Sequence, residues 1–141
     1  MKKVLTLILS SFIFLLSYSW AEAGSIKKVF FDRNLKYIEH EEFAQYYRVE
    51  LYPDNPSDPI TYRFYSMTGK LLAEGSATKL DEKDHTKSIY IGENISYYDN
   101  GNLAERFILD TPGALADADY YEAFDENKRL IFKGSTKGGG Y

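Results

Sequence analysis

Short apolar and aromatic runs alternate with turn-forming residues along most of the chain. Ile60, Tyr62 and Phe64 occupy every second position of the run 60–66, and a period of two is typical of a half-buried β-strand. The same reasoning predicts strands over residues 26–31, 43–52, 60–66, 70–77, 89–91, 95–98, 103–109, 120–124 and 130–133. Together they predict a mainly all-β fold, an antiparallel meander of stacked β-hairpins.

One short helix fits within this pattern. Residues 37–47 include helix-tolerant Glu41 and Ala44, but their apolar positions do not form a stripe with a period of 3.6 residues. We predict a strand for the second half of this segment and leave the first half open. A short helical turn is also expected over 114–116, after a loop that begins at Thr111-Pro112-Gly113.

The turns between the predicted strands carry clear signals. Asn100-Gly101 is the strongest, because this dipeptide adopts the positive φ angles of a tight primed turn. Residues 53–59 hold three of the four prolines and predict a longer loop, since proline cannot donate to a sheet ladder. Residues 79–87 form a polar, charged loop, and the stretch 79–94 could be a lid, an insertion or an ordinary connection.

A pattern recurs across the hairpins: an aromatic residue, a few turn residues, then a leucine that begins the return strand. Its four copies are 31–35, 64–72, 97–105 and 124–130. Their aromatics at 31, 65, 98 and 124 lie 34, 33 and 26 residues apart. The first and last copies have Asn34 and Asn127 where the others have a turn glycine. A single hairpin cannot bury its apolar face, so stacked copies are expected to share one core.

Residues 97–105 and 64–75 resemble the bacterial variant of the MORN repeat, whose units read as two aromatics, a turn with Gly and Lys, a leucine and a charged return strand. The resemblance covers residues 60–134 and extends more weakly over 26–52. It implies stacked β-hairpins. It also implies a relation to exported bacterial proteins described as antitoxin-like.

The first 23 residues read as a cleavable secretory signal peptide. Lys2 and Lys3 precede an apolar run, and Ala21-Glu22-Ala23 matches the small-x-small cleavage pattern. A retained membrane anchor and a buried helix are the alternatives, but the run is short for a span of about 20 residues. We therefore divide the chain into a signal peptide (1–23), a β-hairpin repeat domain (24–134) and a flexible glycine-rich tail (135–141). The mature protein would be periplasmic or secreted, without stable membrane insertion.

Composition narrows the class of partner. Without residues 1–23 the chain carries 15 basic and 20 acidic residues, a formal charge of −5. This balance disfavours nucleic acid, which needs clustered Lys and Arg, and suits either simple solubility or a basic protein partner. The chain has no cysteine, so packing and sheet hydrogen bonds must hold the exported domain together without disulfides.

We find no pattern for catalysis, a cofactor or a metal. The two histidines, His40 and His85, lie in charged stretches that nothing in the sequence brings together. Asp117-Ala118-Asp119 starts like a calcium loop, but Glu122 stands where the turn glycine belongs. We therefore predict a non-enzyme without cofactor or metal.

Surface residues are the remaining candidates for function. Three adjacent tyrosine pairs (46–47, 97–98 and 120–121) should each place one ring in the core and one outside, because neighbours in a strand face opposite ways. Such tyrosines either pack across strands or, rimmed by acids, form a protein interface. The predicted partner-binding residues are Tyr98, Asp99, Asp119, Tyr121, Glu122, Asp81, Glu82 and Asp84.

Three functions remain open. The first is an exported, non-enzymatic protein-binding module, in its most specific form an immunity or antitoxin protein that blocks a secreted toxin or wall-degrading enzyme. The second is a structural cell-envelope repeat protein, and the third is a small hydrolase with unrecognised carboxylates.

Overall fold

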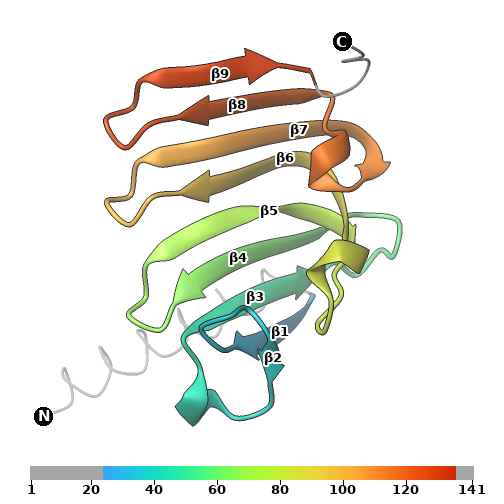
Figure 1. Cartoon of the computed structure of the whole chain (residues 1–141). Helices are drawn as coiled ribbons and strands as arrows, with labels where there is room; N and C mark the ends of the chain where they lie inside the picture. The colour runs from blue at the N-terminus through green and yellow to red at the C-terminus, as the bar shows by residue number, and fades with distance from the viewer. Residues whose placement is uncertain (1–23, 136–141) are drawn as a thin grey trace, which may run out of the picture.

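The computed structural model describes residues 24–135, which form one nine-stranded antiparallel sheet (Figure 1). The strands are β1 (Ser25–Phe31), β2 (Tyr37–Ile38), β3 (Tyr46–Tyr52), β4 (Ile60–Ser66), β5 (Leu71–Lys79), β6 (Ile89–Tyr97), β7 (Leu103–Gly113), β8 (Tyr120–Phe124) and β9 (Leu130–Gly134). Their order is β2-β1-β3-β4-β5-β6-β7-β8-β9, so only β2 leaves the simple meander. The predicted all-β meander is confirmed.

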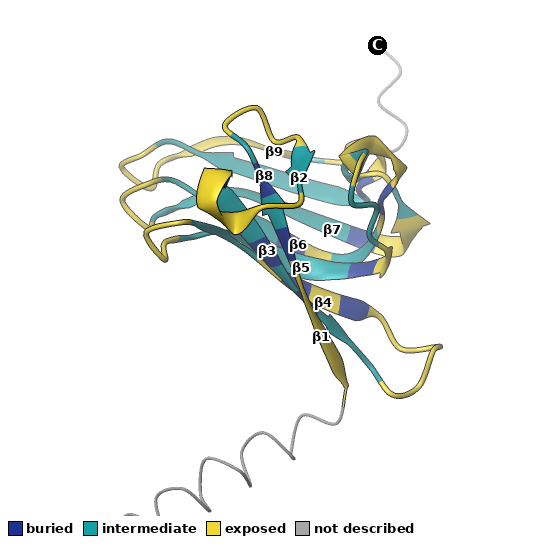
Figure 2. Cartoon of the chain, turned by 90° about the horizontal axis from the view of Figure 1, so that it is seen from below, coloured by how far each residue is buried: buried dark blue, intermediate teal, exposed yellow. Residues whose placement is uncertain are grey.

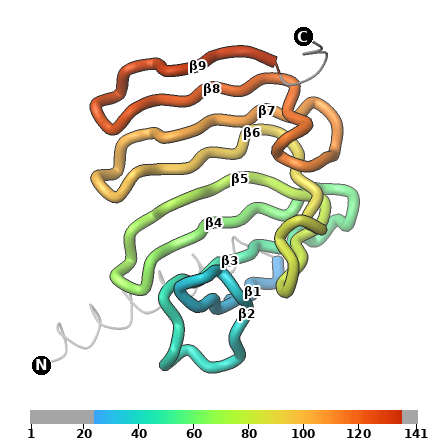
Figure 3. The backbone as a smooth tube through the Cα atoms, in the orientation of Figure 1, coloured from blue at the N-terminus to red at the C-terminus, as the bar shows by residue number. Residues whose placement is uncertain are grey.

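From β3 to β9 each strand reverses the one before it, so the connections alternate between opposite ends of the sheet. Strands β2 and β3 both run antiparallel to β1 on its two sides, and the connection 39–45 between them returns the chain to the end where β3 begins. Tight turns at 32–36, 66–70, 98–102 and 125–129 lie at one end, which we call the turn end (Figure 3). Longer loops at 53–59, 80–88 and 114–119 lie at the other, which we call the loop end. The loops at 80–88 and 114–119 each contain a short 3₁₀ helix, η2 (His85–Lys87) and η3 (Leu115–Asp117).

All four tight turns have the same backbone conformation. In each, the first residue accepts a hydrogen bond from the amide of the fourth and donates one to the carbonyl of the fifth, as in Tyr98, Gly101 and Asn102 at 2.9 Å each. The fourth residue has a positive φ: Leu35 at 61°, Gly69 at 88°, Gly101 at 84° and Lys128 at 66°. The repeated hairpin is therefore a property of the backbone.

This common geometry corrects two sequence interpretations. Asn100 has no positive φ, so 98–102 is a type I turn followed by a left-handed residue instead of the predicted primed turn. When the four turns are superposed, Gly69 and Gly101 correspond to Leu35 and Lys128. Judged by sequence alone, these glycines align with Asn34 and Asn127, one position earlier. The aromatic equivalent to Phe31 is accordingly Tyr97, the residue before the turn.

The positive φ at the fourth turn position predicts opposite effects of two substitutions. We expect Lys128→Gly to raise the free energy of unfolding by about 0.5–1 kcal/mol, because a left-handed conformation costs an L-residue about that much. Gly101→Ala should lower it by a similar amount. Urea titration of both variants measures the effects, and a loss of stability in Lys128→Gly would contradict the assignment of a strained fourth position.

The two faces of the sheet are covered differently. All strand residues that are buried share one face by register, which we call the inner face: Val29, Phe31, Arg48, Glu50, Ile60, Tyr62, Ala77, Asn94 and Leu109. The other buried residues, Ala44, Ser88 and Ala118, belong to segments that fold over this face. In Figure 2 these segments lie on one side of the sheet, and within residues 24–135 no element covers the opposite side, which we call the open face.

Because the loops cover only one face of the sheet, the prediction that each tyrosine pair has one core ring and one exposed ring is wrong. Tyr46 and Tyr47 do point to opposite faces, stacking on Phe64 and Tyr65 respectively. All six tyrosines of the three pairs are nevertheless half-buried. A single sheet without a second layer leaves no face fully buried at these positions, so each pair lacks both a core ring and a fully exposed one.

The segment 37–47, whose first half the sequence left undecided between helix and strand, contains no α-helix. It forms the short edge strand β2, a 3₁₀ helix η1 (Glu41–Phe43) and the beginning of β3 at Tyr46. The short helical turn expected over 114–116 is confirmed as η3, one residue later. The loop predicted at Thr111-Pro112-Gly113 is instead the last part of β7.

Strand β6 is continuous where the sequence indicated two runs. Register shifts in its pairing with β5 and β7 mark a bulge near Gly92, whose φ is 68°. The amide of Asn94 donates to the carbonyls of Ile91 and Gly92 at 3.2 and 3.4 Å, and its oxygen accepts from the Tyr62 hydroxyl at 2.8 Å. The buried amide thus satisfies the carbonyls that the bulge leaves unpaired.

The predicted signal peptide (1–23) and residues 136–141 of the predicted tail lie outside the described residues. In the part that is described, no helix has the length and apolar character needed to cross a membrane.

Candidate functional site at the loop end

The negative charge of the protein is concentrated at the loop end. Residues 53–59, 79–88 and 110–119 together hold eight acidic side chains against three lysines, a formal charge of −5. The acids are Asp54, Asp58, Asp81, Glu82, Asp84, Asp110, Asp117 and Asp119. The four tight turns hold four acidic and five basic side chains, a formal charge of +1. The connection 39–45, which reaches the turn end beside Phe31 and Met67, adds Glu39, Glu41 and Glu42 and brings the formal charge of that end to −2, so the loop end is the more acidic of the two.

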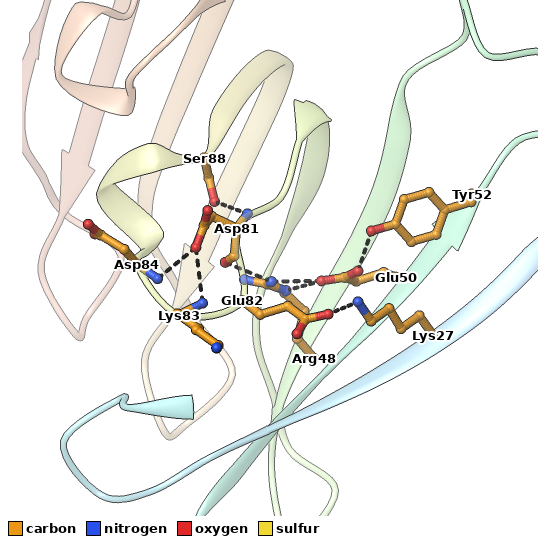
Figure 4. A network of polar contacts seen from close by, with 9 residues as sticks. All are labelled: Lys27, Arg48, Glu50, Tyr52, Asp81, Glu82, Lys83, Asp84 and Ser88. Carbon is orange, nitrogen blue, oxygen red and sulfur yellow. Dashed lines mark hydrogen bonds and ion pairs between the residues drawn. The ribbon is translucent and has the colours of Figure 1, made fainter. Parts of the chain in front are cut away.

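A buried ion pair underlies this acidic end (Figure 4). The Arg48 guanidinium donates to the Glu50 carboxylate from Nε at 2.8 Å and from Nη2 at 2.6 Å, and both side chains are almost inaccessible to solvent. The Tyr52 hydroxyl donates to the second Glu50 oxygen at 2.6 Å. Burial raises the pKa of Tyr52 to about 12, and the hydrogen bond to Glu50 adds to the increase.

The ion pair fastens the 80–88 loop to the inner face. Arg48 Nη2 also donates to the Asp81 carbonyl at 3.3 Å, and the Ser88 hydroxyl accepts from the Asp81 amide at 2.9 Å. Glu82 forms an ion pair with Lys27 of β1. These contacts reach from the loop to two strands beneath it, so the loop is an ordered cover of the sheet.

Hydrogen bonds within the loop hold its carboxylates in their charged form. The Asp81 carboxylate accepts from the amides of Asp84 and Lys83 at 2.8 and 3.0 Å, which lowers its pKa, the Asp84 amide contributing most. The Asp84 carboxylate accepts from the hydroxyl and amide of Thr86, which lowers its pKa and caps η2. Both groups are therefore anionic and fixed in direction at neutral pH.

The structure brings together half of the predicted partner-binding residues. Asp81, Glu82, Asp84 and Asp119 all lie at the loop end, where the Asp119 carboxylate accepts from the Asp110 amide at 2.7 Å. The shared place follows from the meander, because alternate connections of such a sheet return to the same end.

The other predicted residues lie elsewhere. Tyr98 and Asp99 belong to the turn 98–102 at the turn end, where the Tyr98 hydroxyl donates to the Phe124 carbonyl at 2.6 Å. The Tyr121 side chain packs on Phe107 on the inner face. Residues of β8 alternate between faces, so Glu122 lies on the open face.

Glu122 is engaged within the open face. Its carboxylate accepts from the Tyr120 hydroxyl at 2.6 Å and pairs with Arg106 at 3.5 Å. The first of these contacts contributes most to lowering its pKa. The eight predicted residues therefore do not form one surface.

Four acids of the loop end were not among the predicted residues: Asp54, Asp58, Asp110 and Asp117. Asp54 and Asp58 lie in the proline-rich loop, 27 and 23 residues before Asp81 in sequence. Counting strands would have found Asp54 and Asp58, because alternate connections of a meander lie at the same end of the sheet. That count needs the correct number of strands, which the two apparent runs in β6 obscured.

The loop end presents a cluster of carboxylates, several of them fixed by hydrogen bonds. Residues 24–135 contain no group of three or more His, Asp or Glu side chains that could hold a metal ion. A shallow groove of about 520 Å³ lies on the open face, with apolar Val49 and Ile95 beside charged Arg63 and Glu74.

Comparisons with known proteins assign no relative: no family model, no curated protein and no solved structure matches the chain.

Proposed function

We propose that this protein is an exported, non-enzymatic protein-binding module that contacts a basic protein partner through its acidic loop end. The observation that carries the proposal is the unequal charge of the two ends of the sheet, −5 at the loop end against −2 at the turn end when the connection 39–45 is counted. A concentrated field of one sign speeds the encounter with an oppositely charged surface and orients it.

The rigidity of the loops supports the same proposal. Asp81 and Asp84 are fixed by hydrogen bonds to loop amides, and Arg48 ties this loop to the sheet. A partner therefore meets carboxylates that are already ordered, which lowers the conformational entropy lost on binding. Binding residues on loops that a rigid scaffold positions are a common arrangement.

In its most specific form, the proposal is an immunity or antitoxin protein that covers the basic active-site rim of a secreted toxin or wall-degrading enzyme. The expected export and the acidic end motivate this form. The alternative is a structural module of the cell envelope, for which the repeated hairpins are the supporting observation. A structural module should associate with itself or with the wall, whereas an inhibitor should have one partner bound in a fixed ratio.

The acidic end predicts a salt-sensitive partner. Tagged protein recovered after expression of the full chain should capture one basic protein from exported fractions at low salt and release it at high salt. Asp54, Asp58 and Asp117 have exposed side chains outside the loop contacts described above. Changing these three to Asn should weaken capture by on the order of tenfold, mainly through slower association.

A matched control uses three exposed carboxylates away from the loop end. Glu42→Gln, Asp99→Asn and Glu126→Gln together remove the same charge, so loss of capture in both triple variants would indicate a net-charge effect and contradict a loop-end site. Capture of wall fragments alone, unchanged by salt, would favour the structural module.

A further inference from the structure

The two edges of the sheet differ in how far another segment covers the edge strand. At the first edge, β2 pairs with Phe30 and Phe31 of β1, and the Gln45 amide donates to the Phe31 carbonyl at 2.9 Å as the chain folds around that edge. At the other edge stands β9, which pairs with β8 on one side only. Within residues 24–135 no strand lies beyond β9, so its outer backbone groups face outward.

Strand β9 is unusually apolar for an edge. Leu130, Ile131 and Phe132 are consecutive and are 53%, 66% and 50% exposed. Edge strands are normally protected by charge, proline or shortness, because an apolar edge pairs readily with another strand. Repeat proteins likewise need a polar terminal unit to end the stack. Residues 130–132 are apolar and exposed, so this edge lacks both kinds of protection.

The aromatic packing of the inner face also continues to this edge. Phe107 of β7 contacts Tyr121 of β8 with ring centroids 4.8 Å apart, and Tyr121 contacts Phe132 of β9 at 5.6 Å. This ladder runs across three strands and ends at Phe132, which is half exposed. A further strand carrying an aromatic residue opposite Phe132 would extend it.

We propose that β9 pairs with β9 of a second copy of this chain, antiparallel and centred on Phe132, to form a twofold dimer with one continuous sheet. Phe132 then faces Phe132 of the second copy and joins the two aromatic ladders on the inner face. The twofold axis makes the contact self-complementary and closed. It also places the two acidic loop ends at opposite margins of the joined sheet.

Charge disfavours the two neighbouring registers. In an antiparallel pair related by a twofold axis, one residue lies opposite the same residue of the second copy. Only such a register keeps the inner faces of both copies on the same side of the joined sheet. Centring on Lys133 would place two lysines opposite each other, and centring on Ile131 would place Arg129 opposite Lys133. Centring on Phe132 places Ile131 opposite Lys133, whose charge Glu122 balances from the neighbouring strand.

Charge also disfavours head-to-tail stacking onto the other edge. The unpaired part of β1 carries Lys27 and Lys28, and β9 carries Lys133. Pairing these two edges would bring basic residues together along both strands, and like charges across a ladder are destabilising. The closed β9–β9 pair avoids this contact and uses the β9 edge of both copies.

The first test is the mass of the protein in solution. Sedimentation equilibrium on protein recovered from expression of the full chain should give twice the mass of one chain. Ile131→Lys should raise the dissociation constant at least about tenfold, because it places a lysine opposite Lys133 twice in each dimer. Ile26→Lys is the matched control, since Ile26 of β1 is 62% exposed against 66% for Ile131, and it should leave the dimer intact.

The second test checks the register. The chain contains no cysteine, so Phe132→Cys introduces a single thiol that should cross-link two copies on oxidation, its Cα facing its equivalent across the pair. Ile131→Cys should not cross-link, because diagonal positions lie about 7–8 Å apart, beyond the usual reach of a disulfide.

Three outcomes would overturn the proposal. The first is a monomer at every concentration, which would make residues 136–141 the next segment to test on this edge. The second is equal dissociation by both lysine variants, and the third is cross-linking at 131 without cross-linking at 132. None of them bears on binding at the loop end, which has its own capture experiment.

Discussion

Arg48→Met is expected to lower the free energy of unfolding by about 3–5 kcal/mol, the range found when one partner of a buried ion pair is removed. Glu50 is fully buried, and without Arg48 its carboxylate would keep only the hydrogen bond from the Tyr52 hydroxyl. The remaining charge must then be protonated, reached by water or left unpaired, and each of these costs stability.

Urea titration followed by circular dichroism measures this loss, and a double variant separates its causes. Arg48→Met combined with Glu50→Leu removes both charges and should recover much of the stability, because apolar replacement of a whole buried pair is often neutral. Arg63→Met is the matched control, since Arg63 pairs with Glu74 on the open face and is 64% exposed. It should cost less than about 1 kcal/mol, and an equal loss in both single variants would contradict a special role for burial.

The Arg48 substitution also links stability to the proposed site. Arg48 donates to the Asp81 carbonyl, so its loss removes a tie between the 80–88 loop and the sheet. In folded protein, hydrogen exchange of the amides of Lys83, Asp84 and Thr86 should become faster in Arg48→Met, because their partners lie in a less restrained loop.

Gly75→Ala is expected to be the second most disruptive substitution, lowering the free energy of unfolding by about 2–4 kcal/mol. A Cβ at position 75 would overlap the Asn94 side-chain oxygen and come within 3.0 Å of the Asn94 Cα. Asn94 is 1% exposed and its oxygen accepts from the Tyr62 hydroxyl. Moving the amide would leave a buried hydroxyl and two bulge carbonyls without their partner.

The same urea titration tests this expectation, and the chain offers a matched glycine. Gly113→Ala places a Cβ 3.8 Å from Asp117 and Leu109, an ordinary contact distance, and Gly113 has no positive φ. It should be neutral or slightly stabilising because alanine reduces the entropy of the unfolded chain. Equal effects of the two substitutions would show that strand glycines matter here only through propensity.

Much of the fold is determined by local sequence. Ile60–Ser66 and Tyr120–Phe124 are predicted to the residue, because a period of two and β-favouring side chains report directly on a strand with unlike faces. The hairpins at Gly69 and Gly101 are likewise set by residues that tolerate a left-handed backbone. The turns at Leu35 and Lys128 lack that signal, and the sheet on both sides holds them in the same conformation.

The candidate site depends on relations that no local pattern contains. Asp54, Asp84 and Asp119 share one end of the sheet only because two strands, joined by one tight turn, lie between each of their loops and the next. The burial of Glu50 depends on a loop more than 30 residues later, whose Asp81 carbonyl meets Arg48. In sequence, Arg48 and Glu50 look like ordinary polar positions of a half-exposed strand.

The sequence by itself therefore determined strands, turns and an overall negative charge, since these follow from side-chain periodicity, backbone preference and composition. Only the tertiary structure decided which face the loops cover, where the charge gathers and which edge stays open. Those properties arise from contacts between residues far apart in the chain, where register and topology choose the neighbours. A half-covered single sheet leaves Tyr98 and Tyr121 half-buried and Phe132 50% exposed, a result that alternation along one strand could not predict.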